Sequence, residues 1–343
     1  GDVGNTNQPI INDPKTVEET DYLVIESTYG DRLHGERPDY VNQLTEIIQQ
    51  TFDRGGNLVI PAFAVGRTQE LLYLIRTIKE RGLIRGHEGF PVYVDSPLAV
   101  EATRIYADDD AMKPYYDAET LQLLAQGINP IAFPGLRTSV TSADSKAINF
   151  DNTPKIILSA SGMCEAGRIR HHLKHNLWRS ESTILFVGYQ SEGTVGRRLI
   201  DGAETVRLFG EEITVCARIE SLAGISGHAD RDMMLRWLRS MPQKPRHIFV
   251  NHGDDQVTDL FAKTIENALG VQADAPYSGD SYDLIGDICV AKAPIIKATR
   301  LTDGRRRANA AFERLTQAGK RLAAIIAASR GLSNKELARF TDQ

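Results

Sequence analysis

The chain has 343 residues, of which 25% are charged, and a formal net charge of −5. This length predicts about two domains, with enough apolar residues for two cores. The acidic balance argues against binding of nucleic acid by the whole surface, although it permits a local basic track. The three cysteines, Cys164, Cys216 and Cys289, form no CxxC pair, so we expect no disulfide framework, no thiolate zinc site and a reducing, cytoplasmic location.

We expect neither a membrane-spanning segment nor a secretory signal in this sequence. No apolar stretch approaches the roughly 20 residues of a membrane-spanning helix, and the first residues are too polar for a secretory signal, so we expect no membrane partner. The chain opens with Gly1-Asp2-Val3-Gly4 in place of methionine, and it stops just after an expected helix capped by Ser333. We therefore expect a fragment of something longer.

Strand-to-helix units begin early in the chain. A short buried strand that starts near Asp21 delivers Glu26 to a turn, and a polar helical segment runs to about Asp53. The strand expected at residues 57–60 leads through a small-residue turn into a helix. The same pattern recurs, with strands expected at residues 92–94, 155–158 and 184–187 and a helix from about 165 to 177. After the first of these strands, Ser96 is a candidate N-cap with Pro97 at the first helical position. This alternation predicts a mostly parallel sheet whose carboxyl edge gathers turns that can bind anions.

The regular succession of strand, turn and helix ends at about Glu212. Residues 214–219 alternate and predict an antiparallel or mixed strand. Residues 230–238 predict an amphipathic helix, a strand at 247–250 leads to His252, and residues 258–268 predict another helix. The apolar residues expected on the buried side of the first of these helices are Met233, Met234, Trp237 and Leu238. Beyond Asp303 we expect an arginine-rich helix, and we favour its packing on the core over a role as a docking or oligomerisation element.

Basic residues gather in three places along the chain. Such runs are usually solvated helix faces, and on charge alone we favour that interpretation over a nucleic-acid track. The densest groups are Arg168, Arg170, Lys174 and Arg179, then Arg197 and Arg198, and then Arg305–Arg307.

Two histidines each follow a strand-like apolar run: His228 in Ile-Ser-Gly-His-Ala-Asp and His252 in Phe-Val-Asn-His-Gly-Asp. An imidazole at the end of a strand can present one nitrogen to a metal or a leaving group while a carboxylate fixes the other. Asp2 and Glu26 are candidate acidic partners. An isolated histidine is more often an ordinary hydrogen-bonded residue, so the surrounding motifs decide. No P-loop is present, and we infer no nucleotide cofactor.

Six motifs in order carry a resemblance to a known family. They resemble the metallo-β-lactamase-fold RNA-processing enzymes with an inserted β-CASP domain, which include bacterial and archaeal relatives of the cleavage and polyadenylation endonuclease. The Glu-Ser-Thr-Tyr-Gly motif is similar to one subfamily more than to the RNase J branch. The motifs are DYLVIESTYGDR (21–32), PAFAVGRTQE (61–70), SASGMCEAGR (159–168), GYQSEGTVGRR (188–198), ISGHAD (225–230) and VNHG (250–253).

The resemblance runs from Asp2 to about Ile296 and implies an α/β fold. That fold is a metallo-β-lactamase-type αββα sandwich, partial in this chain, with an inserted β-CASP domain built on a mostly parallel sheet. The implied parts are lactamase-type segments at residues 1–30 and 211–297, the β-CASP domain at 31–210 and a C-terminal helical extension at 298–343.

Residue roles follow from the same resemblance. Asp2 matches an aspartate that bridges two zinc ions, and His252 matches a zinc ligand in the third β-CASP motif. Glu26 and His228 match the catalytic acidic residue and histidine of the first two motifs. The implied RNA contacts lie at the sheet edge and are Arg67, Ser161, Gly162, Arg168, Tyr189, Gly193 and Arg197. The family's H-x-H-x-D-H motif precedes the bridging aspartate and has no replacement in this chain, and two ligands do not satisfy zinc, which takes about four.

The leading hypothesis is a zinc-dependent ribonuclease, with two zinc ions in the complete enzyme, that cuts single-stranded RNA internally and leaves a 5′-phosphate. In that mechanism Glu26 fixes His228, and His228 protonates the leaving 3′-oxygen. Three alternatives stay open: a non-catalytic RNA-binding or scaffold member of the family, a truncated inactive form, and a hydrolase of DNA or another phosphodiester. We also expect a homodimer.

Overall fold

The computed structural model describes residues 1–35, 38–107, 109–222, 226–294, 315–316 and 319. The chain divides into two units. The first comprises Gly1–Pro276 with Leu284–Asp287, and the second comprises Tyr277–Asp283 with Ile288–Gln343. Within the described ranges, none of the helices combines the length and apolar character that crossing a membrane requires.

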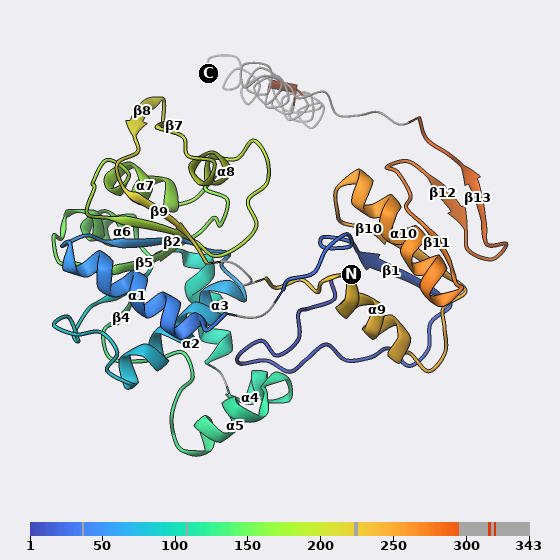
Figure 1. The fold of residues 1–343 in the computed structure, drawn as a ribbon, viewed down its shortest axis with the longest axis horizontal. Helices are drawn as coiled ribbons and strands as arrows, with labels where there is room; N and C mark the ends of the chain where they lie inside the picture. Colours follow the sequence, from blue (N-terminus) through green and yellow to red (C-terminus); the bar gives the residue numbers. More distant parts are fainter. Residues whose placement is uncertain (36–37, 108, 223–225, 295–314, 317–318, 320–343) are drawn as a thin grey trace, which may run out of the picture. The chain divides into compact units, whose positions relative to one another are not determined.

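A parallel sheet of six strands forms the middle of a three-layer part of the first unit (Figure 1). Its strands are β2 (Leu58–Pro61), β3 (Val92–Val94), β4 (Leu136–Thr138), β5 (Ile156–Ser159), β6 (Thr183–Phe186) and β9 (Arg218–Ser221). Their order is β4-β3-β5-β2-β6-β9, and every neighbouring pair is parallel. The expectation of a mostly parallel sheet is therefore confirmed.

Alternating side chains of these strands enter two different cores, because successive residues of a strand point to opposite faces. Leu58 and Ile60 of β2 lie in one core, and Val59 lies in the other. The first core is closed by α1 (Tyr40–Asp53) and α2 (Arg67–Glu80). The second is closed by α7 (Ile169–Asn176) and α8 (Val195–Ile200). Burial on both faces explains why the strands read as continuous apolar runs.

Helix starts follow the capping residues of the sequence. Ser96 accepts a hydrogen bond from the Ala99 N–H and begins α3 (Pro97–Tyr106), with proline at the first helical position as expected. Thr141 and Asp144 form a capping box at α6 (Ser142–Phe150). Short helices lie between these two: α4 (Asp109–Met112), η1 (Lys113–Tyr115) and α5 (Ala118–Ala125).

Two expectations for this part are wrong. The helix expected from about 165 begins at Ile169, because Cys164 (φ 64°) and Gly167 (φ 79°) have left-handed backbone conformations that a right-handed helix excludes. Residues 214–219 do not form one strand. The alternating stretch is divided between β8 (Glu211–Thr214), which pairs with β7 (Thr205–Leu208), and β9, since the N–H groups of residues 216 and 217 bond to a carbonyl after α7.

The six-stranded sheet continues past residue 210, where the resemblance sets the end of the inserted domain. The antiparallel β7–β8 hairpin lies between residues 205 and 214, and β9 then returns to the sheet beside β6. The chain therefore leaves this sheet after Ser221.

A smaller parallel sheet carries the lactamase-type part. Its strands, in the order β1-β10-β11, are β1 (Tyr22–Glu26), β10 (His247–Asn251) and β11 (Gln272–Asp274). Helices α9 (Arg231–Ser240) and α10 (Asp255–Leu269) pack with it around a separate core that holds Ile25, Val250 and Phe261. On α9, Met234 and Leu238 are buried as expected, whereas Met233 and Trp237 are only partly buried.

The second unit contains one described hairpin, in which β12 (Ser281–Asp283) pairs antiparallel with β13 (Ile288–Ala291). The helical extension expected at residues 298–343, including Arg305–Arg307, lies outside the described residues apart from 315, 316 and 319.

Candidate active site

Strand pairing brings Glu26 and His252 to the same edge of the small sheet. β1 and β10 are parallel and in register, so Glu26 stands opposite Asn251 and His252 follows directly. His252 has a φ of 49°, a backbone strain of the kind that concentrates at functional sites. Gly253 then allows the chain to pass close to β1, because a Cβ there would come within 2.3 Å of Ser27 Oγ.

Asp2 and His228 reach the same place by a different pairing. Gly4 forms an antiparallel bridge with His228, and the Ala229 N–H donates to the Val3 carbonyl at 2.9 Å. The first residues of the chain therefore run beside residues 226–230 of the Ile-Ser-Gly-His-Ala-Asp motif, of which Ile225 lies outside the described residues. This pairing puts Asp2 next to the histidine.

Four side chains from these segments form one cluster. Asp2, Glu26, His228 and His252 each offer one donor atom within 4.8 Å of the others. Nδ1 of His228 lies 2.7 Å from Glu26 Oε2 and 3.9 Å from Asp2 Oδ2, and Nδ1 of His252 lies 3.5 Å from Asp2 Oδ1. All four residues that the motifs point to as catalytic or metal-binding are thus brought together.

Glu26 is fully buried and its oxygens are occupied. Oε1 accepts from the Val3 N–H at 2.8 Å, and Oε2 accepts from Thr28 Oγ1 at 2.7 Å in addition to contacting His228. The contact with Glu26 raises the pKa of His228 above its ordinary value, against the opposite effect of burial. A carboxylate held in this way orients the imidazole and increases its basicity.

The cluster has the chemistry of a zinc site. Imidazole nitrogens and carboxylate oxygens are ligands that zinc accepts. Asp2 and His252 are the side chains most available as metal ligands, because they are 59% and 57% exposed. The oxygens of Glu26 are already bonded to protein partners. The described residues therefore fit part of a zinc coordination shell, with two open ligands where zinc takes about four.

A cavity of about 690 Å³ lies against this cluster. Asp2, His228 and His252 line it, together with Arg67 and Tyr189 from the segments that follow β2 and β6. The guanidinium of Arg67 pairs with Glu70 on the next turn of α2. Two of the seven residues expected to contact RNA thus share one cavity with the cluster.

The remaining expected RNA contacts lie in neighbouring turns, and among the described residues none of them lines the cavity. Arg168 is turned inward, where it donates to Asp95 Oδ1 at 2.7 Å and to the carbonyls of Ser139 and Val140. Ser161 Oγ bonds to the Ala166 backbone, Gly193 has a φ of 82°, and Arg197 pairs with Asp201 at 2.9 Å. Gly162 lies next to the ring of Phe63, since a Cβ added at Gly162 would be 3.2 Å from two ring carbons.

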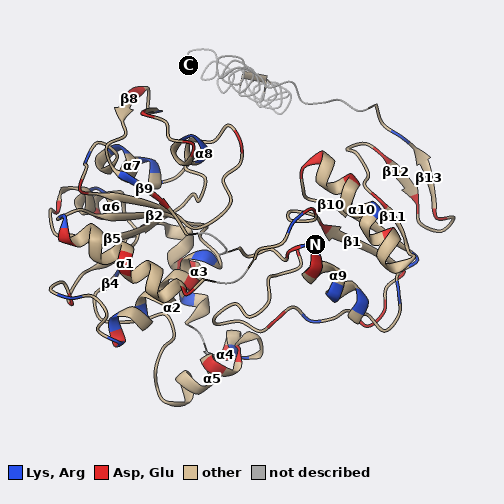
Figure 2. Cartoon of the chain, in the orientation of Figure 1, with Lys and Arg blue, Asp and Glu red and all other residues tan. Residues whose placement is uncertain are grey.

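Figure 2 shows basic residues on α7 and α8. Two of the four Lys and Arg residues on these helices, Lys174 and Arg197, pair with an acidic residue, as does Arg179 beyond the end of α7, and such pairing is typical of solvated helix faces. The pairs are Lys174–Glu211, Arg179–Glu181 and Arg197–Asp201.

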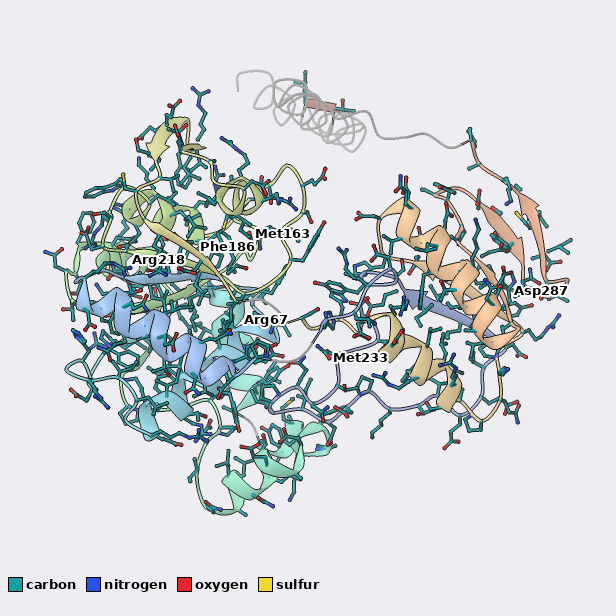
Figure 3. All side chains as sticks on the ribbon, viewed as in Figure 1. Arg67, Met163, Phe186, Arg218, Met233 and Asp287 are labelled. Atoms are coloured by element: carbon teal, nitrogen blue, oxygen red, sulfur yellow. The ribbon has the colours of Figure 1, made fainter. Side chains whose placement is uncertain are left out.

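Reasoning from sequence missed an apolar part of the cavity wall. Phe63, Val65 and Met163 line the cavity, although none was expected to have a role. Met163 and Arg67, both labelled in Figure 3, come from the segments after β5 and β2. A signal was available, because Phe63 and Val65 stand in a turn where a buried strand has already ended.

The fold and site together define an α/β protein with a four-residue acidic and histidine cluster at the edge of a parallel sheet. Two family models match consecutive stretches of the chain: a Beta-Casp domain at residues 68–199, and a domain described as "Zn-dependent metallo-hydrolase RNA specificity domain" at residues 212–276. The chain belongs to the metallo-β-lactamase-fold family that carries a β-CASP domain. The resemblance seen in the motifs is confirmed.

Curated relatives agree with this assignment. The chain is 38% identical over 256 residues to a ribonuclease of Thermus thermophilus, which covers 75% of this chain and 57% of that protein. It is 33% identical over 268 residues to the transcription termination factor FttA of Methanocaldococcus jannaschii (76% and 41%). It is 32% identical over 265 residues to an RNase J-like protein of the same organism (77% and 59%). The chain thus spans about two fifths to three fifths of these relatives.

Proposed function

We propose that the protein to which this chain belongs is a zinc-dependent ribonuclease that cuts single-stranded RNA internally and leaves a 5′-phosphate. The observation that carries the proposal is the convergence of Asp2, Glu26, His228 and His252 within 4.8 Å beside a cavity of about 690 Å³. The naming of a relative as a ribonuclease supports it.

In this proposal Asp2 and His252 hold metal, since both side chains are more than half exposed and line the cavity, whereas both Glu26 oxygens are occupied by protein partners. The chemistry that zinc supplies at such a site is Lewis-acid stabilisation of charge on phosphoryl oxygens and a water nucleophile at neutral pH. Glu26 faces one nitrogen of His228, so the other nitrogen is available to donate a proton to the leaving oxygen. In the metal-free protein the contact with Glu26 raises the pKa of His228, and this direction suits a general acid.

The direct test uses the full-length protein with zinc and an end-labelled single-stranded RNA. We expect internal cuts, 5′-phosphate ends and about 10²- to 10⁴-fold slower cleavage by His228→Ala, the usual range for loss of a general acid. The matched control is His87→Ala, because His87 pairs with Asp53 away from the cluster. A fully active His228→Ala contradicts the proposed role, and equal cutting of a matched DNA contradicts the choice of substrate.

A second candidate is an RNA-binding protein that does not cut. It is favoured by the relatives named transcription termination factor, a name that states no cleavage. RNA binding by the wild-type full-length protein without any cleavage in zinc supports this candidate. A homodimer is also proposed, and sedimentation of the full-length protein tests it.

A further inference from the structure

Part of the cavity wall has no use in metal binding or proton transfer. Phe63, Val65 and Tyr189 line the cavity with exposed fractions of 54%, 58% and 42%. A single exposed apolar side chain is ordinary, but several in one cavity indicate a binding surface. The cavity therefore has the acidic and histidine cluster on one wall and an apolar, aromatic surface on another.

The sheet explains why these side chains meet. Phe63 follows β2, and Tyr189 follows β6. β2 and β6 are parallel neighbours, so the turns after them leave the sheet at one edge. This is the same carboxyl edge at which open parallel sheets bind ligands.

The ring of Phe63 is held in place from behind. Gly162, in the turn after β5, lies so close that a Cβ there would be 3.2 Å from two ring carbons. The Gly162 carbonyl in turn accepts from Gln190 Nε2 at 3.0 Å, and Gln190 is only 5% exposed. The Phe63 carbonyl accepts from Thr68 Oγ1 at 2.7 Å. Three turns of the sheet edge thus fix the position of one exposed ring.

We propose that Phe63 and Tyr189 form a nucleobase-binding subsite, in which an unpaired base next to the cleaved phosphodiester stacks on the ring of Phe63. This inference rests on the proposed function, because it assumes that the polymer in the cavity is RNA. An aromatic ring binds any base through its π face, so the subsite selects unpaired bases without selecting sequence. Bases in a duplex are already stacked on one another and cannot use it.

Binding to a non-cleavable single-stranded RNA, measured by fluorescence anisotropy with the full-length protein, tests the subsite. We expect Phe63→Ala to weaken binding about 5- to 150-fold, the range for loss of one base–aromatic stack. Phe63→Trp keeps a ring and should restore binding. Phe150→Ala is the matched control, since Phe150 is 74% exposed on α6 and does not line the cavity.

A second arm removes the base and keeps the phosphate. RNAs with one abasic nucleotide, moved along the oligonucleotide, should show one position that weakens wild-type binding, and Phe63→Ala should lose this extra effect. Gly162→Ala, which pushes on the ring, should behave in the same direction without loss of folding. Equal weakening of intact and abasic RNA by Phe63→Ala overturns the subsite, as does unchanged binding.

The two proposals fail differently. If the base-dependent loss is seen and the wild-type protein cuts no RNA in zinc, the subsite stands and the ribonuclease proposal falls. If cleavage is normal in Phe63→Ala and no abasic position matters, the subsite falls and the ribonuclease proposal stands. Loss of binding by Phe150→Ala to the same extent as by Phe63→Ala also overturns the subsite.

Discussion

The carboxylate of Glu26 lies 2.7 Å from Nδ1 of His228, although Glu26 ends β1 and His228 comes from the segment before α9. Glu26 is buried and held by Val3 and Thr28, so the imidazole has little freedom to turn. Glu26 is thus buried inside the lactamase-type part, and its partner His228 lines the cavity.

Glu26→Gln should lower the pKa of His228, because the contact with the carboxylate is the main cause of its raised value. NMR titration of the histidine ring in the metal-free protein measures the change. In the full-length protein with zinc, cleavage near neutral pH should fall about 10²- to 10⁴-fold with the loss of proton donation. Glu101→Gln is the control, since Glu101 forms an exposed pair with Arg104 on α3 and does not line the cavity. An unchanged His228 pKa in Glu26→Gln contradicts the role of this contact.

Removing either of the two proposed metal ligands, Asp2 or His252, should weaken metal binding. Asp2→Asn and His252→Ala should each lower the zinc affinity of the full-length protein by at least about 100-fold. Loss of a residue that only hydrogen-bonds to a metal ligand costs up to about 100-fold, and loss of a ligand itself should cost no less. Calorimetric titration with zinc measures this effect, and affinity should rise with pH because the ligands must be deprotonated. His87→Ala should bind zinc as the wild type does. Retained affinity in both Asp2→Asn and His252→Ala would show that metal lies elsewhere.

Asp95→Asn should destabilise the fold strongly. Asp95 is fully buried at the end of β3 and contacts Arg168 at 2.7 Å and His172 Nε2 at 2.6 Å. The amide removes the negative charge that compensates the Arg168 guanidinium, and breaking a buried pair costs about 3–5 kcal/mol. Urea unfolding measures the change. Glu101→Gln removes an exposed pair with Arg104 and should cost at most about 1 kcal/mol. Equal effects of the two substitutions would contradict the importance of burial.

The same carboxylate predicts a loss of stability in acid. Burial alone raises the pKa of Asp95, but hydrogen bonds from His172 and Ser145 outweigh it and lower the pKa to about 2. A carboxyl with a lowered folded-state pKa stabilises the fold above its unfolded-state pKa of about 4 and loses that contribution as the pH falls toward 2. The free energy of unfolding, measured in urea from pH 5 to pH 2, should fall less in Asp95→Asn than in the wild type. If the free energy of unfolding falls equally with pH in the wild type and in Asp95→Asn, Asp95 is not the source of the acid sensitivity.

Much of the fold was predictable, because local pattern specifies it. Buried strands followed by small-residue turns predicted the parallel sheet, and Ser96 with Pro97 predicted a helix start that the structure shows. The start of α7 was not predictable from periodicity, since left-handed backbone at Cys164 and Gly167 interrupts an otherwise helical pattern. Residues 214–219 alternate as one strand does, yet hydrogen bonds to a distant carbonyl divide them.

The sequence indicated which residues form the candidate cluster, but it did not indicate which contacts the surrounding residues make. The motifs singled out Asp2, Glu26, His228 and His252, and the structure gathers all four. They also singled out Arg168 as an RNA contact, whereas its guanidinium lies against Asp95. Phe63 received no role, although its place in the turn after a buried strand was a signal. That Phe63 and Tyr189 line one cavity depends on the packing of two separate turns, which a linear pattern does not contain.

The sequence by itself determined the family, the parallel sheet and the types of residue that do chemistry, because motifs, strand periodicity and helix caps are properties of short segments. Only the tertiary structure decided which of these side chains meet. Parallel pairing of β1 with β10 sets Glu26 beside the turn of His252, and pairing of Gly4 with His228 adds the other two members. Such contacts depend on strand register and on burial between segments far apart in the chain, and these are set by packing of the whole fold.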